Sequence, residues 1–442
     1  MEGISARPHV QGEDRGLQVE WTDERLTDGP GLLSLRSAWD ALGLGAALDR
    51  MCAAVGGRYR PSLMVEQWLA LLWYGGGCLD HLELLEKRGV RELFGWESVA
   101  DPTTFGRWLR RGGDHVAEAV EKLTREVVQL RWSVCGVPEE VMLIFDSTVV
   151  LRYGKDQAGA EVGYNPRKRG RPSHHPMLGF LDTGDCVRAR WRPGRSNCAA
   201  GAEADLSEAV EWLRASGVER IVVRLDKGFF SRRMVEHLQA LKVDFVLKVQ
   251  ESEPLQARKG SFERYGPDPR LSVSEGEWAD ARLLCVRDWK DPEANELELG
   301  LGPVVLKQQA TILTNIEGLD AVEAWRLYNQ GAVVEHRIEE MGQLAVGKTA
   351  IDDLGGNRLL WAMGGLAYEL MHVVRTVGLS GPWQHAQVKS LRNWLIRMPA
   401  KLVRHARAVC VKLMRHEPMT DLLVKAVQRL EAMRGPPLLL RG

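Results

Sequence analysis

This sequence has no pattern of paired cysteines and no long hydrophobic run. Its seven cysteines are scattered, and none of them forms a C-x-x-C pair. An odd, unpatterned set is typical of a reducing compartment and argues against a disulfide or zinc framework. No apolar run approaches the about 20 residues that span a bilayer, and the N-terminus lacks the basic and apolar regions of a signal peptide. We therefore expect a cytoplasmic protein with no membrane contact.

Acidic residues are absent from Leu370 to His416, although the whole chain balances 59 Lys and Arg against 59 Asp and Glu. The basic residues of this segment include Lys389, Arg392, Arg397, Lys401, Arg404, Arg407, Lys412 and Arg415. A second basic cluster lies in the sequence NPRKRGRPSHH at 165–175. Such patches suit a polyanion, because the release of counterions from phosphates favours binding. A solvated basic face is the alternative interpretation of either patch.

The first third of the chain has the pattern of helices. Asp101 can cap a helix whose first residue is Pro102. An apolar stripe with spacings of four and three then predicts a long helix, with Val116, Val120, Leu123, Val127 and Leu130 on one face. Because Gly112 and Gly113 separate an arginine-rich helix from this one, a DNA-reading helix-turn-helix is possible, and plain helix packing is the alternative.

The pattern after residue 136 is that of an α/β sheet. The apolar run VMLIF ends in Asp146, and the run IVVRL ends in Asp226. Both runs predict buried strands. An amphipathic helix at 202–217 precedes the second strand, and another at 228–243 separates it from a third strand at 244–249. Residues 182–186 predict a turn at Thr183-Gly184-Asp185 between two further strands. Residues 250–317 are β-rich and irregular, and the chain is helical again from Leu319.

Aspartates at the carboxyl ends of two buried strands are candidates for chemistry, because ligands bind at this edge of an α/β sheet. A buried carboxylate needs a partner, either a cation such as Arg152, Arg224 or Lys227, or a divalent metal. Aspartate and glutamate oxygens suit Mg²⁺ or Mn²⁺. Two such ions can activate a water or a 3′-hydroxyl and stabilise the leaving oxygen of a phosphodiester.

The stretch LYNQGAVVEHRIEEM at 327–341 predicts one helix that can supply a third carboxylate. Tyr328, Gly331, Glu335, Glu339 and Gly342 share one stripe of this helix. A stripe that faces a core would be apolar, so this one faces either solvent or a site.

Four segments together resemble the DDE transposases of bacterial insertion sequences: FDSTVV with GAEVGYNPRKRGRPSHHPML, RWRPG, VRLDKGFFS and YNQGAVVEHRI. Within them the sequence is most similar to insertion-sequence family 1380, in the insertion-sequence family 4 group. The resemblance extends over most of the chain, since PTTFGRWLRR and NRLLWAMGGLAYELMHVVR match the helical regions at either end.

The resemblance implies an α/β fold with an RNase H-like catalytic domain, interrupted by a β-rich insertion and flanked by N-terminal and C-terminal helical regions. We expect a polar arm at 1–30, a helical DNA-end-binding domain at 31–135, the first part of the core at 136–250, the insertion at 251–317, the second part of the core at 318–378 and basic C-terminal helices at 379–442.

The resemblance also implies the site. Asp146, Asp226 and Glu335 correspond to the catalytic metal ligands, because Tyr328 sets the register and Glu335 follows seven residues later; Glu339 is the alternative. Mg²⁺ is the expected cofactor, with Mn²⁺ tolerated. The residues expected to contact DNA are Tyr328, Arg167, Lys168, Arg169, Arg171, Lys227, Arg337, Arg404 and Arg407.

The sequence departs from the family pattern where Gly331 and Gly342 replace an arginine and a lysine that grip phosphates, and where Lys227 replaces a small residue. We expect a transposase that binds terminal inverted repeats, pairs two ends as a homodimer, and cleaves and joins DNA strands. The alternatives are a domesticated DNA-binding protein that no longer transposes, motivated by the two glycines, and an RNase H-like nuclease unrelated to transposition. Trp278 and Trp289 could stack on an extruded base, with core packing as the alternative.

Overall fold

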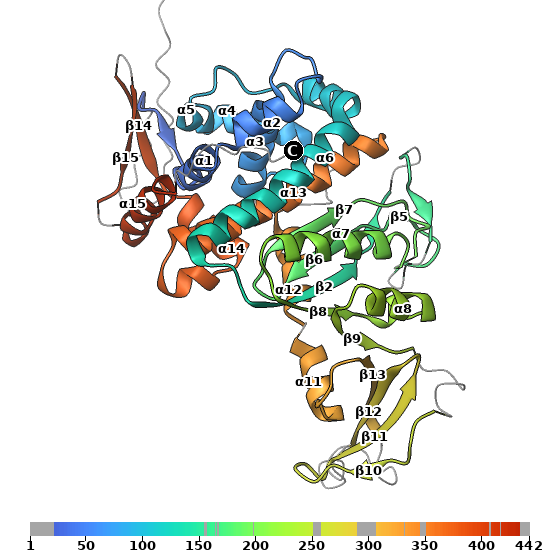
Figure 1. Cartoon of the computed structure of the whole chain (residues 1–442). Helices are drawn as coiled ribbons and strands as arrows, with labels where there is room; N and C mark the ends of the chain where they lie inside the picture. The colour runs from blue at the N-terminus through green and yellow to red at the C-terminus, as the bar shows by residue number, and fades with distance from the viewer. Residues whose placement is uncertain are drawn as a thin grey trace, which may run out of the picture.

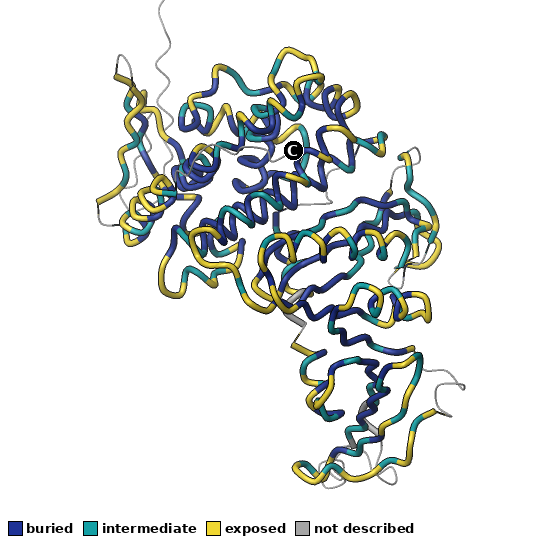
Figure 2. Tube along the Cα trace, viewed as in Figure 1, coloured by how far each residue is buried: buried dark blue, intermediate teal, exposed yellow. Residues whose placement is uncertain are grey.

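The computed structural model describes residues 22–153, 157–163, 165, 168–197, 199–250, 258–289, 306–330, 332–344, 351–405, 408–415 and 417–433, without the side chains of 289, 306–308 and 332–334. Figure 1 shows a helical part, a central sheet and a narrower strand-rich extension. Figure 2 shows that buried residues run through the helical part and the central sheet and continue into the extension. Among the helices described, none is long and apolar enough to cross a membrane.

The helical part is built around two long helices, α6 (Pro102–Cys135) and α13 (Leu354–Val373). The shorter helices around them are α1 (Leu32–Ala41), α2 (Leu44–Met51), α3 (Pro61–Tyr74), η1 (Leu79–His81), α4 (Leu82–Lys87), α5 (Val90–Phe94) and α15 (Pro418–Glu431). Asp101 caps α6 as predicted, accepting hydrogen bonds from the N–H groups of Thr103 and Thr104 at 2.8 and 3.2 Å. The predicted apolar stripe is confirmed, since its first four members are fully buried.

The predicted break at Gly112-Gly113 is wrong, and with it the helix-turn-helix interpretation of this segment. Helix α6 runs through both glycines without interruption. A Cβ atom on Gly113 would lie 2.4 Å from the carbonyl carbon of Gly355 in α13. The glycine therefore serves the close approach of two helix backbones, and it does not mark a turn.

Within the described residues the central sheet has nine strands, in the order β10-β11-β12-β13-β9-β8-β2-β6-β7. Its middle strands are β2 (Glu140–Ser147), β6 (Met177–Leu181), β7 (Cys186–Arg190), β8 (Arg220–Leu225) and β9 (Asp244–Lys248). Strands β2, β8 and β9 run parallel, whereas β6 and β7 are antiparallel to their neighbours. The predicted turn between β6 and β7 is confirmed, with Gly184 at a φ of 98°.

Both faces of the middle strands are covered, which explains their continuous apolar runs. Met142 and Ile144 of β2 belong to the core shared with α6 and α13. Val141, Leu143 and Phe145 point to the other core, beneath α7 (Ala202–Ala215) and α8 (Arg232–Ala240). Successive residues of one strand therefore enter two different cores.

Four strands between β9 and α11 in the chain extend the sheet into the narrow part of the molecule (Figure 1). They are β10 (Glu263–Arg264), β11 (Leu271–Trp278), β12 (Ala281–Trp289) and β13 (Leu306–Thr314). Strand β13 pairs antiparallel with β9. Trp278 packs against Phe230 with ring centroids 5.0 Å apart, as the core-packing interpretation expects; the Trp289 side chain lies outside the described residues.

The segment around residues 397–413 was predicted to form helices, and this prediction is wrong. Strands β14 (Ala400–His405) and β15 (Ala408–Leu413) form an antiparallel hairpin, and β1 (Leu26–Thr27) adds to β14. Pro399 disfavours a helix through the preceding residue, and the buried side chains Ala400 and Leu402 alternate with more exposed ones. This period of two is that of a strand.

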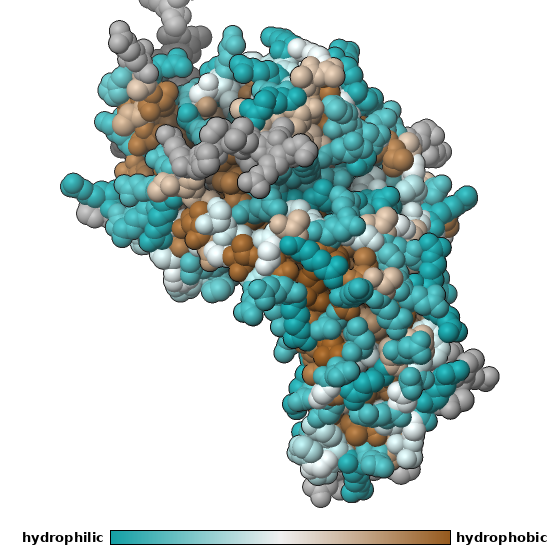
Figure 3. Space-filling model, viewed as in Figure 1, coloured by the Kyte–Doolittle hydropathy of each residue, from teal (hydrophilic) through white to brown (hydrophobic). Residues whose placement is uncertain are grey.

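A small sheet lies beside the core, with the order β3-β5-β4. Its strands are β3 (Val150–Leu151), β4 (Glu161–Val162) and β5 (Pro172–His174). The surface visible in Figure 3 is mostly hydrophilic, with hydrophobic side chains gathered in patches along the middle of the molecule.

Candidate active site

Asp146 and Asp226 lie side by side at the carboxyl ends of two adjacent parallel strands. The register pairs Phe145 of β2 with Leu225 of β8, and each aspartate is the next residue in its chain. Both residues are half-buried. Two local apolar runs therefore place two carboxylates at one edge of the sheet, where such sheets bind ligands.

The carboxylate of Asp146 lies in a site that disfavours negative charge. Burial, together with the charges of Asp226 and Glu335, raises its pKa to about 6. The N–H of Ser147, 2.7 Å from Oδ1, and the charge of Arg224 act in the opposite direction. A partly buried carboxylate that other carboxylates repel is a place where a cation is electrostatically favoured.

Tyr328 contacts this pair of aspartates directly. It lies in α11 (Ala321–Gln330), is 5% exposed, and its hydroxyl donates to Oδ1 of Asp226 at 3.0 Å. Burial raises the pKa of Tyr328, so the hydroxyl remains a proton donor. The sequence predicted a DNA contact for this residue. The structure directs its hydroxyl to Asp226, since a buried hydroxyl is satisfied internally, and the DNA contact stays a prediction.

Arg224 holds Tyr328 in place from the sheet. Its Nε donates to the Tyr328 carbonyl oxygen at 3.2 Å, and its guanidinium lies 4.3 Å from the centre of the Tyr328 ring. Of the three cations considered from the sequence, Arg224 is the one whose charge reaches Asp146. Arg152 is occupied with His174 and the Trp191 ring.

Glu335 lies in α12 (Ala332–Gln343), and its side chain is exposed. The sequence predicted one helix through Tyr328 and Glu335, and the described residues on both sides of position 331 are helical, as α11 and α12. Gly331, which lies between them, is outside the described residues. Glu339 is also exposed and faces His336 at 3.8 Å. Between the two glutamates, Glu335 is the one whose charge acts on Asp146.

A buried ion-pair cluster fixes the other face of α12. Glu340 follows Glu335 by five residues, about 140° around a helix. Arg375, in the π-helical turn η3 (Val374–Gly378) after α13, donates to both Glu340 oxygens at 2.7 and 3.3 Å. Arg337 donates to the same carboxylate at 3.1 Å. Sequence reasoning missed this cluster, although the position of Glu340 on the face opposite Glu335 was the available signal.

Arg337 belongs to this cluster. Its guanidinium is half-buried, paired with Glu340 and hydrogen-bonded to Tyr368. The ion pair competes with a phosphate for this guanidinium, and the DNA contact of Arg337 stays a prediction.

The other predicted DNA contacts lie at several places on the surface. Lys227, in η2 (Lys227–Phe229), is exposed and forms no ion pair with Asp226, its described neighbour. Lys168 and Arg171 are exposed near the Tyr153 ring, at 5.6 and 5.9 Å from its centre. Arg169 and Arg404 are exposed as well. Arg167 and Arg407 lie outside the described residues.

The described residues contain no group of three His, Cys, Asp or Glu side chains compact enough to be a complete metal site. Asp146 and Asp226 nevertheless supply the hard oxygen donors that Mg²⁺ prefers. Burial and the charge of Asp226 both raise the pKa of Asp146, and a cation beside the two carboxylates would offset both effects. The charge of Glu335 also acts on Asp146.

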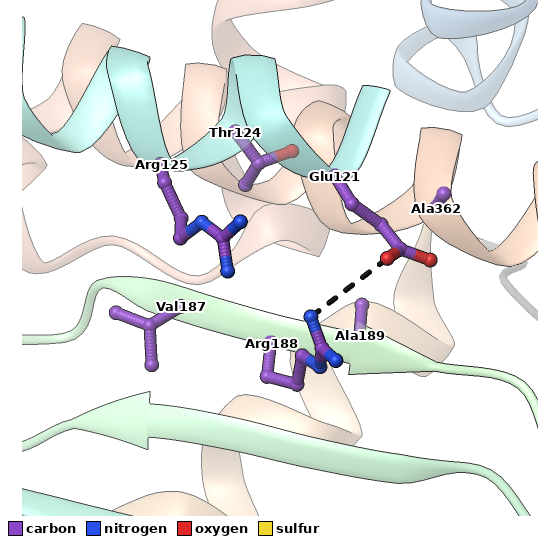
Figure 4. Close-up of a pocket in the computed structure, with 7 residues that line it drawn as sticks. All are labelled: Glu121, Thr124, Arg125, Val187, Arg188, Ala189 and Ala362. Atoms are coloured by element: carbon purple, nitrogen blue, oxygen red, sulfur yellow. Dashed lines mark ion pairs between the residues drawn. The ribbon is translucent and has the colours of Figure 1, made fainter. Parts of the chain in front are cut away.

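A separate small pocket lies between α6, β7 and α13 (Figure 4). Arg188 faces Glu121 across it at 3.9 Å. Strand β7 is separated from β2 by β6, so the pocket is not part of the aspartate site. Its arginine also pairs with Asp205 and Glu208, which makes it a structural ion-pair cluster.

The aspartate pair agrees with the family to which the sequence is related. Residues 10–435 match a family model described as "Transposase DDE domain group 1". The chain belongs to this family. The model spans nearly the whole chain, from the helical part through the sheet to α15. DDE transposase domains act on DNA and typically use divalent metals.

A solved structure, the cryo-EM structure of a piggyBac transposase synaptic complex with hairpin DNA, shares 13% sequence identity with the chain. The alignment covers 84% of this chain and 81% of that chain, with a TM-score of 0.39. A similarity at this level carries no argument about the site. No curated protein matches the sequence.

Proposed function

We propose that this DDE-family protein is an active transposase that binds the terminal inverted repeats of a transposon, cleaves its ends and transfers their 3′-hydroxyls to target DNA. The observation that carries the proposal is the placement of Asp146 and Asp226 side by side at adjacent strand ends, with the charge of Glu335 acting on the first of them. The specific resemblance to insertion-sequence family 1380 remains a prediction.

The proposed catalytic core is RNase H-like. In chain order its strands are β2, β6, β7, β8 and β9, and in the sheet they lie in the order β7-β6-β2-β8-β9. The first three strands are antiparallel and the last two run parallel to the first, which supports this fold. Strands β10–β13 correspond to the proposed insertion at 251–317, between the second aspartate and the glutamate.

Asp146, Asp226 and Glu335 are the proposed ligands of Mg²⁺, with Mn²⁺ as a substitute. When bound, such ions activate the attacking oxygen and stabilise the leaving oxygen of a phosphodiester. Tyr328 orients the Asp226 carboxylate by occupying one of its oxygens, and Arg224 orients Tyr328. Hydrogen bonds that orient ligands in this way tune metal sites strongly.

DNA is the proposed partner, held by exposed cations. The candidates are Lys168, Arg169, Arg171, Lys227 and Arg404, together with Arg167 and Arg407 outside the described residues. Pairing of two transposon ends requires two copies, so we propose a homodimer in the end complex. The N-terminal helical part, with helix packing in place of a helix-turn-helix at Gly112-Gly113, is the proposed end-binding domain.

Nicking of the DNA that flanks the gene tests the proposal. With Mg²⁺, wild-type protein should nick a labelled end duplex, whereas Asp146→Ala and Glu335→Ala should not. Glu339→Ala is the matched control, because Glu339 is an exposed carboxylate on the same helix. Equal nicking by wild type and Asp146→Ala would refute the site, and loss with Glu339→Ala but not Glu335→Ala would reassign the third carboxylate.

A domesticated DNA-binding protein is the second candidate, favoured by Gly342. This residue is exposed on α12, and a Cβ atom there would meet no atom within 4 Å. A lysine therefore fits without a clash, and its absence is not imposed by packing. If Gly342→Lys steepens the log–log salt dependence of end binding by about 0.9 and creates nicking absent from wild type, the domesticated reading holds. An RNase H-like nuclease would nick DNA without strand transfer.

A further inference from the structure

An exposed tryptophan lies on the side of the molecule where α12 ends. Trp394 belongs to the π-helical turn η5 (Arg392–Ile396) and is 61% exposed. Its two following neighbours, Leu395 and Ile396, are both 1% exposed. The turn is therefore anchored in the core by these neighbours, while the indole ring is presented to solvent, although tryptophan is strongly buried on average.

This turn and the short helix before it, α14 (Val388–Leu391), are hydrogen-bonded to the helix that carries Glu335. The backbone N–H of Lys389 donates to the side chain of Gln343, the last residue of α12, at 2.9 Å. The guanidinium of Arg392 donates to the Gln343 carbonyl oxygen at 2.9 Å and to that of Trp73 at 3.1 Å. From Glu335 to Gln343 the helix rises about 12 Å. Trp394 follows Arg392 by two residues and therefore lies near the C-terminal end of α12, the helix that carries Glu335.

The charge around Trp394 selects the kind of partner. No Asp or Glu occurs from Leu370 to His416, and Lys389 is exposed five residues before the tryptophan. The nearby Arg392 and Arg397 donate to backbone carbonyl oxygens, whereas the exposed Lys389 can attract a phosphate and repel a basic protein. An exposed indole face adds a stacking surface, and aromatic rings beside basic residues are the usual platform for unpaired nucleotides.

We infer that Trp394 stacks on an unpaired base of a DNA strand that passes the active site, with Lys389 contacting a neighbouring phosphate. The inference rests on the proposed function and adds a single-strand subsite to it. An unpaired base is required because a base within a duplex already stacks on both of its faces. Single-stranded DNA beside a cut supplies such bases.

Binding of two labelled probes by the full chain, without metal so that no cleavage occurs, tests this subsite. One probe is a duplex with a single-stranded oligo-dT tail, and the other is the same duplex with blunt ends. Trp394→Ala should weaken binding of the tailed duplex about 5- to 100-fold and leave binding of the blunt duplex unchanged. Trp394→Phe should restore most of the loss, because it keeps a stacking ring.

Salt dependence separates stacking from charge. Trp394→Ala should leave the log–log salt slope unchanged, whereas Lys389→Ala should reduce it by about 0.7 for the tailed probe. The inference is overturned if Trp394→Ala binds the tailed duplex as wild type does, if it loses both probes equally, or if it converts a dimer into a monomer, which would assign the ring to a protein interface. Binding of neither probe by wild type would instead refute the proposed function.

Discussion

The substitution Glu340→Ala should break the ion pairs that hold α12 against Arg375 and should lower the free energy of unfolding. The carboxylate accepts both Arg375 hydrogen bonds and one from Arg337. In Glu340→Ala, Arg375, whose side chain is 3% exposed, keeps its charge without this partner. Breaking a buried ion pair from one side costs about 3–5 kcal/mol, because the remaining charge stays desolvated. The adjacent Glu339 is 70% exposed, so Glu339→Ala should cost less than about 1 kcal/mol.

Urea denaturation of the full chain and its two single variants measures this difference. Glu340→Gln is the informative third variant, since an amide keeps one acceptor for Arg375 but loses the charge, and we expect an intermediate loss. Nicking should follow the same order, at a DNA affinity close to that of wild type, because the cluster sets the rotation of α12 and hence where Glu335 points. Equal free energies of unfolding for Glu340→Ala and Glu339→Ala would refute the reasoning.

Three further changes have expected outcomes. Tyr328→Phe removes the hydrogen bond to Asp226 and should lower the nicking rate roughly 10- to 100-fold, measured at saturating DNA. Burial raises the pKa of Glu66 to about 7, so the folded state binds a proton that the unfolded state releases near pH 4.5; stability from this group is lost as pH rises through 7. We expect the free energy of unfolding of wild type, measured by denaturation, to fall by about 3 kcal/mol between pH 5 and 8. Glu66→Gln should remove most of this pH dependence. Gly113→Ala should lower the thermal midpoint by a shift worth about 1–3 kcal/mol or more, because its Cβ would meet the backbone of Gly355.

Each of these outcomes has a matched control. Tyr59→Phe removes a hydroxyl from another tyrosine remote in the fold and should leave nicking unchanged. Glu97→Gln changes a carboxylate with an exposed side chain and should not alter the pH profile. Gly342→Ala adds a methyl group to open space on α12 and should stabilise the protein by about 0.5–1 kcal/mol. A destabilising Gly342→Ala or a neutral Gly113→Ala would contradict the packing argument.

Local pattern was sufficient for the elements that carry the two aspartates. A run of apolar residues with no polar interruption indicates a strand covered on both faces, and Asp146 and Asp226 follow two such runs. The Asp101 cap and the stripe of α6 were predictable for the same reason, because they depend on residues within a few turns of one another. The choice of Glu335 as the third carboxylate, in contrast, came from the family resemblance. The structure adds only the influence of its charge on Asp146.

Contacts between distant segments decided the rest. The hairpin at 400–413 forms where the sequence predicted helices, and β1 from the start of the chain adds to its β14 edge. The two glycines of α6 predict a break from the sequence, whereas in the structure Gly113 is where the backbone of α13 comes close. The hydroxyl of Tyr328 meets Asp226 only once α11 packs on the sheet, and the partner of Glu340 is Arg375, across the end of α13. Sequence alone therefore determined which residues end strands and fill helix faces, since those depend on neighbours along the chain. Which polar groups satisfy one another was decided by tertiary structure, because buried donors and acceptors take partners that the fold brings from far along the chain.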